Sequence, residues 1–200
     1  MSSFANKILE LSAAFGLYDW WASRCLKQVY DTLVGLADLC GDEEILDVGC
    51  GTGMLSSRLA KVSDGISVHG VDISPRMITT AGRRTRGCHL NAEYTVGTAT
   101  KLPCSDGQFD VVSSCVLFHL LRDSEKELAL REIFRVLKPG GRYVCAEFEK
   151  YPAWFSCKRL LEYPNDLIGI VGFDVDAQFA GPSITRCHSV VYRALIKPGD

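Results

Sequence analysis

Residues 45–53 read Ile-Leu-Asp-Val-Gly-Cys-Gly-Thr-Gly, and this stretch decides the fold. Apolar residues lead into an aspartate, and three glycines then follow at alternate positions. Glycine allows positive φ angles and lets the backbone approach a ligand closely. The next residues, about 54–62, have the pattern of a helix. A strand, a glycine turn and a helix in this order predict the nucleotide-binding start of a doubly wound α/β sheet.

The chain around this stretch alternates between predicted strands and helices. Five strands are expected in the centre of the chain, at about 44–48, 67–72, 92–97, 109–114 and 142–148. The expected helices lie at about 4–15, 18–39, 54–62, 75–84 and 125–137. This alternation is typical of an α/β fold, a mainly parallel sheet with helices on both faces.

Local signals mark several ends of these elements. Ser74 can cap a helix with Pro75 in its first turn, and Ser124 is predicted to cap the helix at 125–137. The sequence Lys138-Pro139-Gly140-Gly141 marks the end of that helix. Beyond it we expect a helix at 154–171 and strands at about 174–180 and 187–196, separated by Gly181-Pro182-Ser183. These last strands predict a closing antiparallel hairpin, which completes a seven-stranded sheet.

Composition restricts the class of protein. The 200 residues suit a single domain, and the net charge of −2 does not favour a polyanion-binding protein. No apolar run is long enough to cross a membrane, and the N-terminal residues lack a secretory pattern, so a cytoplasmic location is expected. The nine cysteines include no Cys-x-x-Cys pair, which favours free thiols. We expect no metal site, since only Cys88-His89 and Cys187-His188 suggest one and no spacing argument supports it.

The glycine spacing restricts the ligand. The nicotinamide dinucleotide pattern has glycine at its first, third and sixth positions, and Met54 stands at the sixth. A ligand without phosphates is therefore favoured. Asp72 follows the second predicted strand, about 20 residues beyond the glycines, where a carboxylate can accept two hydrogen bonds from a ribose. Ile73 is expected on the adenine face.

Several further segments carry a resemblance to a known family. The chain resembles the class I S-adenosylmethionine-dependent methyltransferases, and within them the small-molecule branch that includes ubiquinone and menaquinone C-methyltransferases. The resemblance covers about 44–148 and rests on Asp47 before the glycines, Gly97-Thr98-Ala99, the segment with His119, and Arg135-Val136-Leu137-Lys138-Pro139-Gly140-Gly141. It implies a Rossmann-like methyltransferase fold and a small methyl acceptor. It also implies the cofactor S-adenosylmethionine, with S-adenosylhomocysteine as product.

The resemblance also implies a set of cofactor-binding residues. Thr98 stands where the family often has an aspartate that accepts a hydrogen bond from the adenine amino group. A hydroxyl accepts more weakly than a carboxylate, which predicts softer cofactor binding. The full expected set is Asp47, Gly49, Cys50, Gly51, Gly53, Asp72, Ile73, Met77, Thr98, Ala99 and Ser114.

Candidates for the removal of a proton lie at strand ends. His119 is one, with a pocket-lining role as an equal alternative, and either Glu147 or Glu149 is another. Tyr18 could close over the methionine end or pack in the core. We expect residues 1–42 to cover the acceptor site, 43–148 to bind the cofactor, and 149–200 to form the last helix and hairpin.

The acceptor and rival functions stay open at this stage. Trp20, Trp21 and Trp154 flank the cofactor core, which suggests an apolar or aromatic acceptor, although ordinary packing explains them equally. One alternative is a catalytically silent partner subunit, and another is a nucleic-acid methyltransferase. The arginines at 83–86 fit a solvated helix end better than an RNA site. Met54 disfavours a nicotinamide dehydrogenase. We expect a monomer or homodimer.

Overall fold

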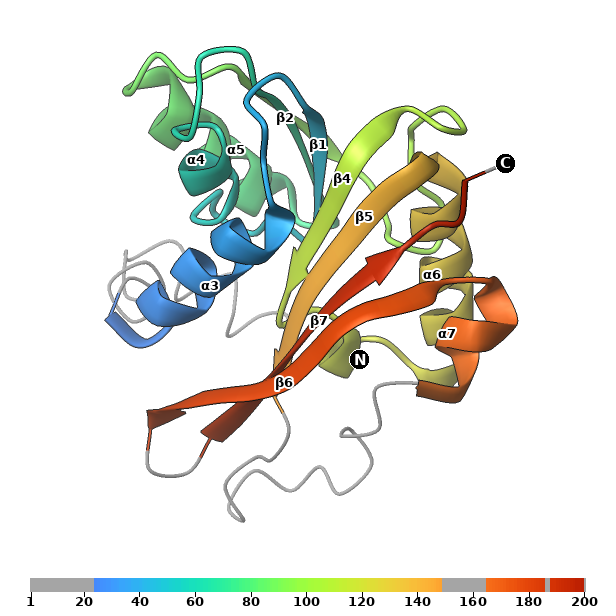
Figure 1. Ribbon diagram of the computed structural model, residues 1–200. Helices are drawn as coiled ribbons and strands as arrows, with labels where there is room; N and C mark the ends of the chain where they lie inside the picture. Colours follow the sequence, from blue (N-terminus) through green and yellow to red (C-terminus); the bar gives the residue numbers. More distant parts are fainter. Residues whose placement is uncertain (1–23, 149–164, 186–187, 200) are drawn as a thin grey trace.

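The computed structural model describes residues 24–148, 165–185 and 188–199, and a seven-stranded sheet forms its centre. The strand order across the sheet is β3-β2-β1-β4-β5-β7-β6 (Figure 1). The strands are β1 Glu44–Val48, β2 Ser67–Asp72, β3 Ala92–Val96, β4 Phe109–Cys115, β5 Leu137–Phe148, β6 Asp174–Thr185 and β7 His188–Ile196.

The strand directions confirm the expected mainly parallel sheet. Strands β1 to β5 run parallel to one another, whereas β7 pairs antiparallel with both β5 and β6. The chain crosses from β3 to the far side of β1, where β4 pairs. The order therefore reverses next to β1. Ligands of doubly wound sheets bind at the carboxyl ends of the strands beside such a reversal.

Helices cover both faces of the sheet, as expected. They are α3 Lys27–Ala37, α4 Ser56–Leu59, α5 Pro75–Arg86, α6 Asp123–Val136 and α7 Asn165–Val171, with the 3-10 turn η1 Phe118–Leu120 (Figure 1). Successive strand residues point to opposite faces, so Ile45 belongs to a buried cluster that includes α3, whereas Leu46 belongs to a second one that includes residues of α6 and α7. The predicted helix 4–15 lies outside the described residues, as do the early parts of those predicted at 18–39 and 154–171.

Two of the predicted element ends are confirmed, and several others are wrong. Ser74 caps α5, because its hydroxyl accepts the Met77 amide at 3.5 Å, and α6 ends at Val136. Ser124 lies inside α6, whose N-cap is Arg122. The Arg122 amide donates to the Glu125 carboxylate at 2.9 Å, which starts the helix earlier than a serine cap would.

The second wrong end is the hairpin turn. Strand β6 continues to Thr185, so Gly181-Pro182-Ser183 lies within the strand, at a shift in its pairing with β7. The predicted helix at 54–62 is shorter than expected, since α4 contains only Ser56–Leu59. Lys138–Gly141 belongs to β5 as an irregular segment, where Gly140 has φ 76° and its amide donates to Lys197 at 2.8 Å.

Candidate functional site

The glycine loop follows the carboxyl end of β1, at the reversal of strand order. Gly49, Gly51 and Gly53 have φ angles of 73°, 54° and 76°, all in the left-handed region that favours glycine. The Gly49 and Cys50 amides both donate to the Val71 carbonyl, at 2.7 and 3.1 Å, which ties the loop to the end of β2. The loop therefore has the backbone geometry expected of a close-approach ligand cradle.

Asp72 stands at the end of β2, facing this loop. Its Oδ2 accepts the Gly51 amide at 3.0 Å, and its Oδ1 accepts the Ser74 amide at 2.8 Å. Burial raises the pKa of Asp72, and these two amides oppose the rise. Each carboxylate oxygen has a second lone pair, so the group can still accept two hydroxyl donors. The neighbouring Ile73 side chain is 71% exposed, an apolar surface beside the carboxylate.

Asp47 lies beneath the loop and is buried. Its Oδ2 accepts the Ser56 hydroxyl at 2.5 Å, and its Oδ1 accepts the Ser113 hydroxyl at 3.2 Å. Burial raises the pKa of Asp47 to about 6, despite these two hydroxyls. With both oxygens engaged by serines from α4 and β4, the geometry fits a group that supports the loop from below.

A pH dependence of stability follows from Asp47. Its pKa is about 6 in the fold against 3.8 in a model compound, so the fold disfavours the ionised form above pH 6. The cost of burying the ionised carboxylate falls as pH drops through 6 towards 4, so the free energy of unfolding rises over that range. Between about pH 7.5 and 5 we expect wild type to gain on the order of 1 kcal/mol relative to Asp47→Asn. Urea unfolding at both pH values measures this gain, and parallel behaviour of the two proteins contradicts it.

The loop after β3 carries Thr98 and Ala99. The Thr98 hydroxyl contacts the Thr100 hydroxyl at 3.0 Å, and Ala99 is buried. Helix α6 holds this loop, because Glu132 accepts the Leu102 amide at 2.7 Å and Arg135 donates to the Cys104 carbonyl at 2.9 Å. No motif in the sequence pointed to Glu132 as an anchor of this loop.

Besides Asp47 and Ala99, three more of the predicted cofactor residues have buried side chains. The Ser114 hydroxyl lies 2.8 Å from the Tyr143 hydroxyl, inside the core, so only its backbone is left to face a ligand. Met77 lies in the first turn of α5, and its side chain is buried. Burial raises the pKa of the Cys50 thiol well above its usual value, which keeps it protonated.

His119 and Glu147 are brought together by the ends of β4 and β5. His119 lies in η1, and its Nδ1 is 3.5 Å from Oε2 of Glu147. The Glu147 side chain is buried, and its Oε1 accepts the backbone amides of Leu117 and Phe118. Tyr18, Glu149 and the three tryptophans lie outside the described residues.

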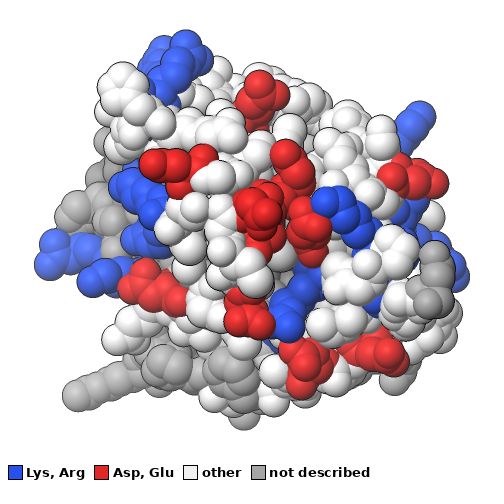
Figure 2. Space-filling view, turned by 45° about the horizontal axis from the view of Figure 1, so that its top comes forward, with Lys and Arg blue, Asp and Glu red and all other residues white. Residues whose placement is uncertain are grey.

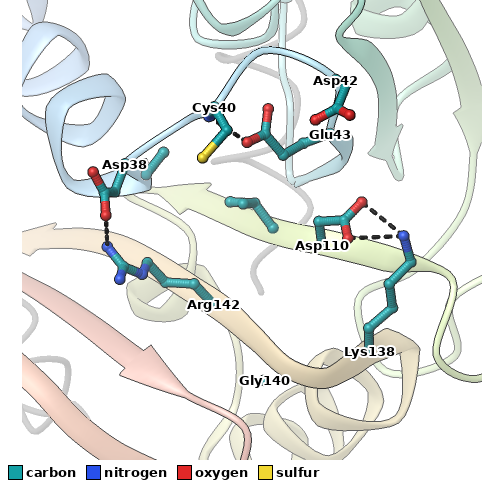
Figure 3. A pocket seen from close by; sticks show the side chains of 10 residues that line it. Asp38, Cys40, Asp42, Glu43, Asp110, Lys138, Gly140 and Arg142 are labelled. Atoms are coloured by element: carbon teal, nitrogen blue, oxygen red, sulfur yellow. Dashed lines mark hydrogen bonds and ion pairs between the residues drawn. The ribbon is translucent and has the colours of Figure 1, made fainter.

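A pocket of about 460 Å³ lies at the opposite end of the sheet (Figure 3). It adjoins the amino ends of β4 and β5, and its two cationic side chains pair with aspartates. Lys138 binds both oxygens of Asp110, and Arg142 lies 3.5 Å from Asp38. Glu43 accepts the Cys40 and Gly41 amides. The two cationic side chains of this pocket are therefore each engaged by an aspartate.

Surface charge is mixed on the face drawn in Figure 2, where acidic side chains gather in the middle and basic ones lie around them. Of the arginines at 83–86, Arg84 donates to the Thr52 carbonyl at 2.8 Å and so fastens α5 to the glycine loop. Within the described ranges, no cluster of three or more His, Cys, Asp or Glu residues suits a metal ion. No helix in the described part of the chain is long and apolar enough to span a bilayer.

Comparison with known proteins agrees with this geometry. Residues 45–141 match the family model described as "Methyltransferase domain". The chain is 39% identical to a demethylmenaquinone methyltransferase of Thermus thermophilus over 110 residues, which are 55% of this chain and 49% of the relative. It is 33% identical to a ubiquinone/menaquinone biosynthesis C-methyltransferase of Rubrivivax gelatinosus over 142 residues, 71% of this chain and 50% of the relative.

A solved structure agrees as well. An S-adenosylmethionine-dependent methyltransferase of Methanosarcina mazei superposes with a TM-score of 0.69 at 25% identity, covering 81% of this chain and 95% of that one. The chain spans about half the length of the curated relatives that it matches.

Proposed function

We propose that this protein is a class I S-adenosylmethionine-dependent methyltransferase that transfers a methyl group to a small molecule, because residues 45–141 match the model described as "Methyltransferase domain" and the relatives above are methyltransferases. The observation that carries the proposal is the loop of three left-handed glycines, joined to the Asp72 carboxylate through the Gly51 amide. This pair lies at the carboxyl ends of β1 and β2, where the fold binds ligands.

The residues around the loop fit S-adenosylmethionine better than a dinucleotide. Asp72 has acceptor capacity left for a ribose diol, and the exposed Ile73 side chain offers an apolar surface for adenine. A pyrophosphate needs the N-terminus of a substantial helix. Here α4 is only four residues long, and the buried Met54 replaces the third glycine of the dinucleotide pattern.

The cofactor supplies an activated methyl group on its sulfonium, so the chain's own task is to bind, align and exclude water. In this proposal the glycine loop and Asp72 hold the nucleoside, while Asp47 supports the loop. His119 is the proposed proton acceptor, because its partly exposed imidazole follows β4 and lies beside Glu147. A role for Tyr18 stays a prediction. The Thr98 hydroxyl already contacts Thr100, which is consistent with a weak adenine contact.

We further propose an apolar or aromatic acceptor, covered by the segments that flank the cofactor core at residues 1–42 and 149–200. Support comes from the aromatic content of these segments and from the two quinone-pathway relatives. A cytoplasmic monomer or homodimer is also part of the proposal. The free cysteines among the described residues are consistent with a reducing compartment.

Calorimetric titration with S-adenosylmethionine is the first test. Saturable binding supports the proposal, and no binding at millimolar cofactor contradicts it. Incubation with methyl-labelled cofactor and a metabolite extract then separates an enzyme from a catalytically silent partner subunit, which would bind without transferring label. Salt-dependent RNA binding with label transfer to RNA would favour the nucleic-acid alternative.

A further inference from the structure

The turn after β4 contains a strained residue. Val116 has φ 57°, in the left-handed region that a β-branched side chain rarely adopts. Asp38 and His89 are the other non-glycine residues with positive φ in the described part of the chain, and neither is β-branched. The Val116 amide donates to the Ala146 carbonyl at 2.8 Å. A backbone strained in this way persists only where its surroundings hold it.

Glu147 supplies the contacts that hold this turn. Its Oε1 accepts the amides of Leu117 and Phe118, at 2.7 and 2.8 Å, and the glutamate is buried. One carboxyl oxygen thus fixes the two residues that directly follow Val116. The Phe118 amide would be left in a buried environment without this acceptor, which is costly.

The segment Val116–Phe118 also lies against the glycine loop. A Cβ placed on Gly49 would lie 2.8 Å from Cδ1 of Leu117, so the Leu117 side chain lies directly against that glycine. His119 follows in the same turn, with its Nδ1 3.5 Å from Oε2 of Glu147. Glu147 therefore connects the end of β5 to both the glycine loop and the imidazole.

We infer that Glu147 is a positioning residue: it holds the strained Val116–Phe118 turn against Gly49 and thereby shapes the wall of the cofactor site. This inference rests on the proposed function for the identity of the cofactor. It assigns Glu147 a role different from the proton acceptor that the sequence suggested. We assign this positioning role because Oε1 of Glu147 already accepts two backbone amides.

The test combines Glu147→Gln with two readouts. A neutral amide accepts the two backbone N–H groups more weakly than a carboxyl group that carries charge. We expect the affinity for S-adenosylmethionine, measured by calorimetry, to fall about tenfold. We also expect hydrogen exchange at the Leu117 and Phe118 amides to become at least several-fold faster, measured by NMR.

Glu43→Gln is the matched control. Glu43 also accepts two backbone amides, those of Cys40 and Gly41, but at the amino ends of the strands (Figure 3). Glu43→Gln therefore shows what the loss of a carboxylate that accepts two backbone amides does away from the glycine loop. The inference requires that Glu43→Gln leave the cofactor affinity and the exchange of Leu117 and Phe118 within twofold of wild type.

A rescue variant separates positioning from simple destabilisation. Glycine adopts the left-handed region without strain, so Val116→Gly should lessen the need for Glu147. We expect Glu147→Gln to lower cofactor affinity less than threefold in the Val116→Gly background. An unchanged tenfold loss in that background overturns the inference, as does wild-type affinity in Glu147→Gln alone. If wild type binds no cofactor, the proposed function fails, and the exchange rates still decide whether Glu147 holds the turn.

Discussion

Gly53→Ala is expected to lower the free energy of unfolding by about 3 kcal/mol, which combines left-handed strain with overpacking. Gly53 has φ 76°, and a Cβ there would lie 2.9 Å from Cβ and 3.1 Å from Cα of Ala81 in α5. The second of these contacts is with backbone, so α5 would have to move away from the loop. For a chain of this size the melting temperature should fall by about 10 °C, as calorimetry can measure.

Two other glycines separate strain from packing. Gly107 has φ 58° with nothing within 4 Å of its Cβ position. Gly107→Ala therefore introduces backbone strain without overpacking and should lower the free energy of unfolding by about 1 kcal/mol. Gly35 lies in α3 with open space around it, and Gly35→Ala should stabilise the protein by up to about 1 kcal/mol. If Gly53→Ala proves no less stable than Gly107→Ala, the close approach of the loop to α5 is wrong.

Asp72→Ala is expected to weaken binding of S-adenosylmethionine about 100-fold, equivalent to about 3 kcal/mol. The substitution removes the acceptor for the Gly51 and Ser74 amides, as well as the proposed acceptor for the ribose hydroxyls. Hydrogen bonds to a charged group contribute about 1.5–3 kcal/mol each, so losing them accounts for an effect of this size. Calorimetric titration of the purified variant gives the affinity directly.

Asp110→Ala is the matched control for this experiment. Asp110 also accepts a backbone amide, that of Glu44 at 3.0 Å, and pairs with Lys138. It lies at the amino end of β4, away from the glycine loop, so its loss should affect stability and not cofactor affinity. Equal weakening by the two variants would mean that Asp72 has no specific part in binding.

Much of the fold could be predicted because the deciding signals are local. Strands β1 and β2 have the bounds that the apolar pattern indicated, and the Ser74–Pro75 start of α5 is confirmed. The cap predicted at Ser124 was wrong because the Glu125 side chain accepts the Arg122 amide and so places the start of α6 before Ser124. The turn expected at Gly181–Ser183 was wrong because pairing with β7 carries β6 past it.

Less of the candidate site than of the fold could be predicted from the sequence. Glycine spacing identified the loop, and a carboxylate after the second strand identified Asp72, since both are defined by distance along the chain. Ser114 was expected to face the ligand, but its hydroxyl contacts Tyr143, a residue 29 positions away. The anchoring roles of Glu132 and Arg84 were also missed, because each binds backbone of a distant segment.

The sequence by itself determined the order of strands and helices along the chain and the position of the glycine loop, while its resemblance to a methyltransferase family implied the cofactor. The elements and the loop depend on residue periodicity and on glycine's access to positive φ, both local properties of the chain. Only the tertiary structure decided that Glu147 holds the strained Val116 turn against Gly49 and that Asp47 is buried with a raised pKa. Burial and hydrogen-bond partners arise when segments far apart in sequence pack together, and no local pattern records that packing.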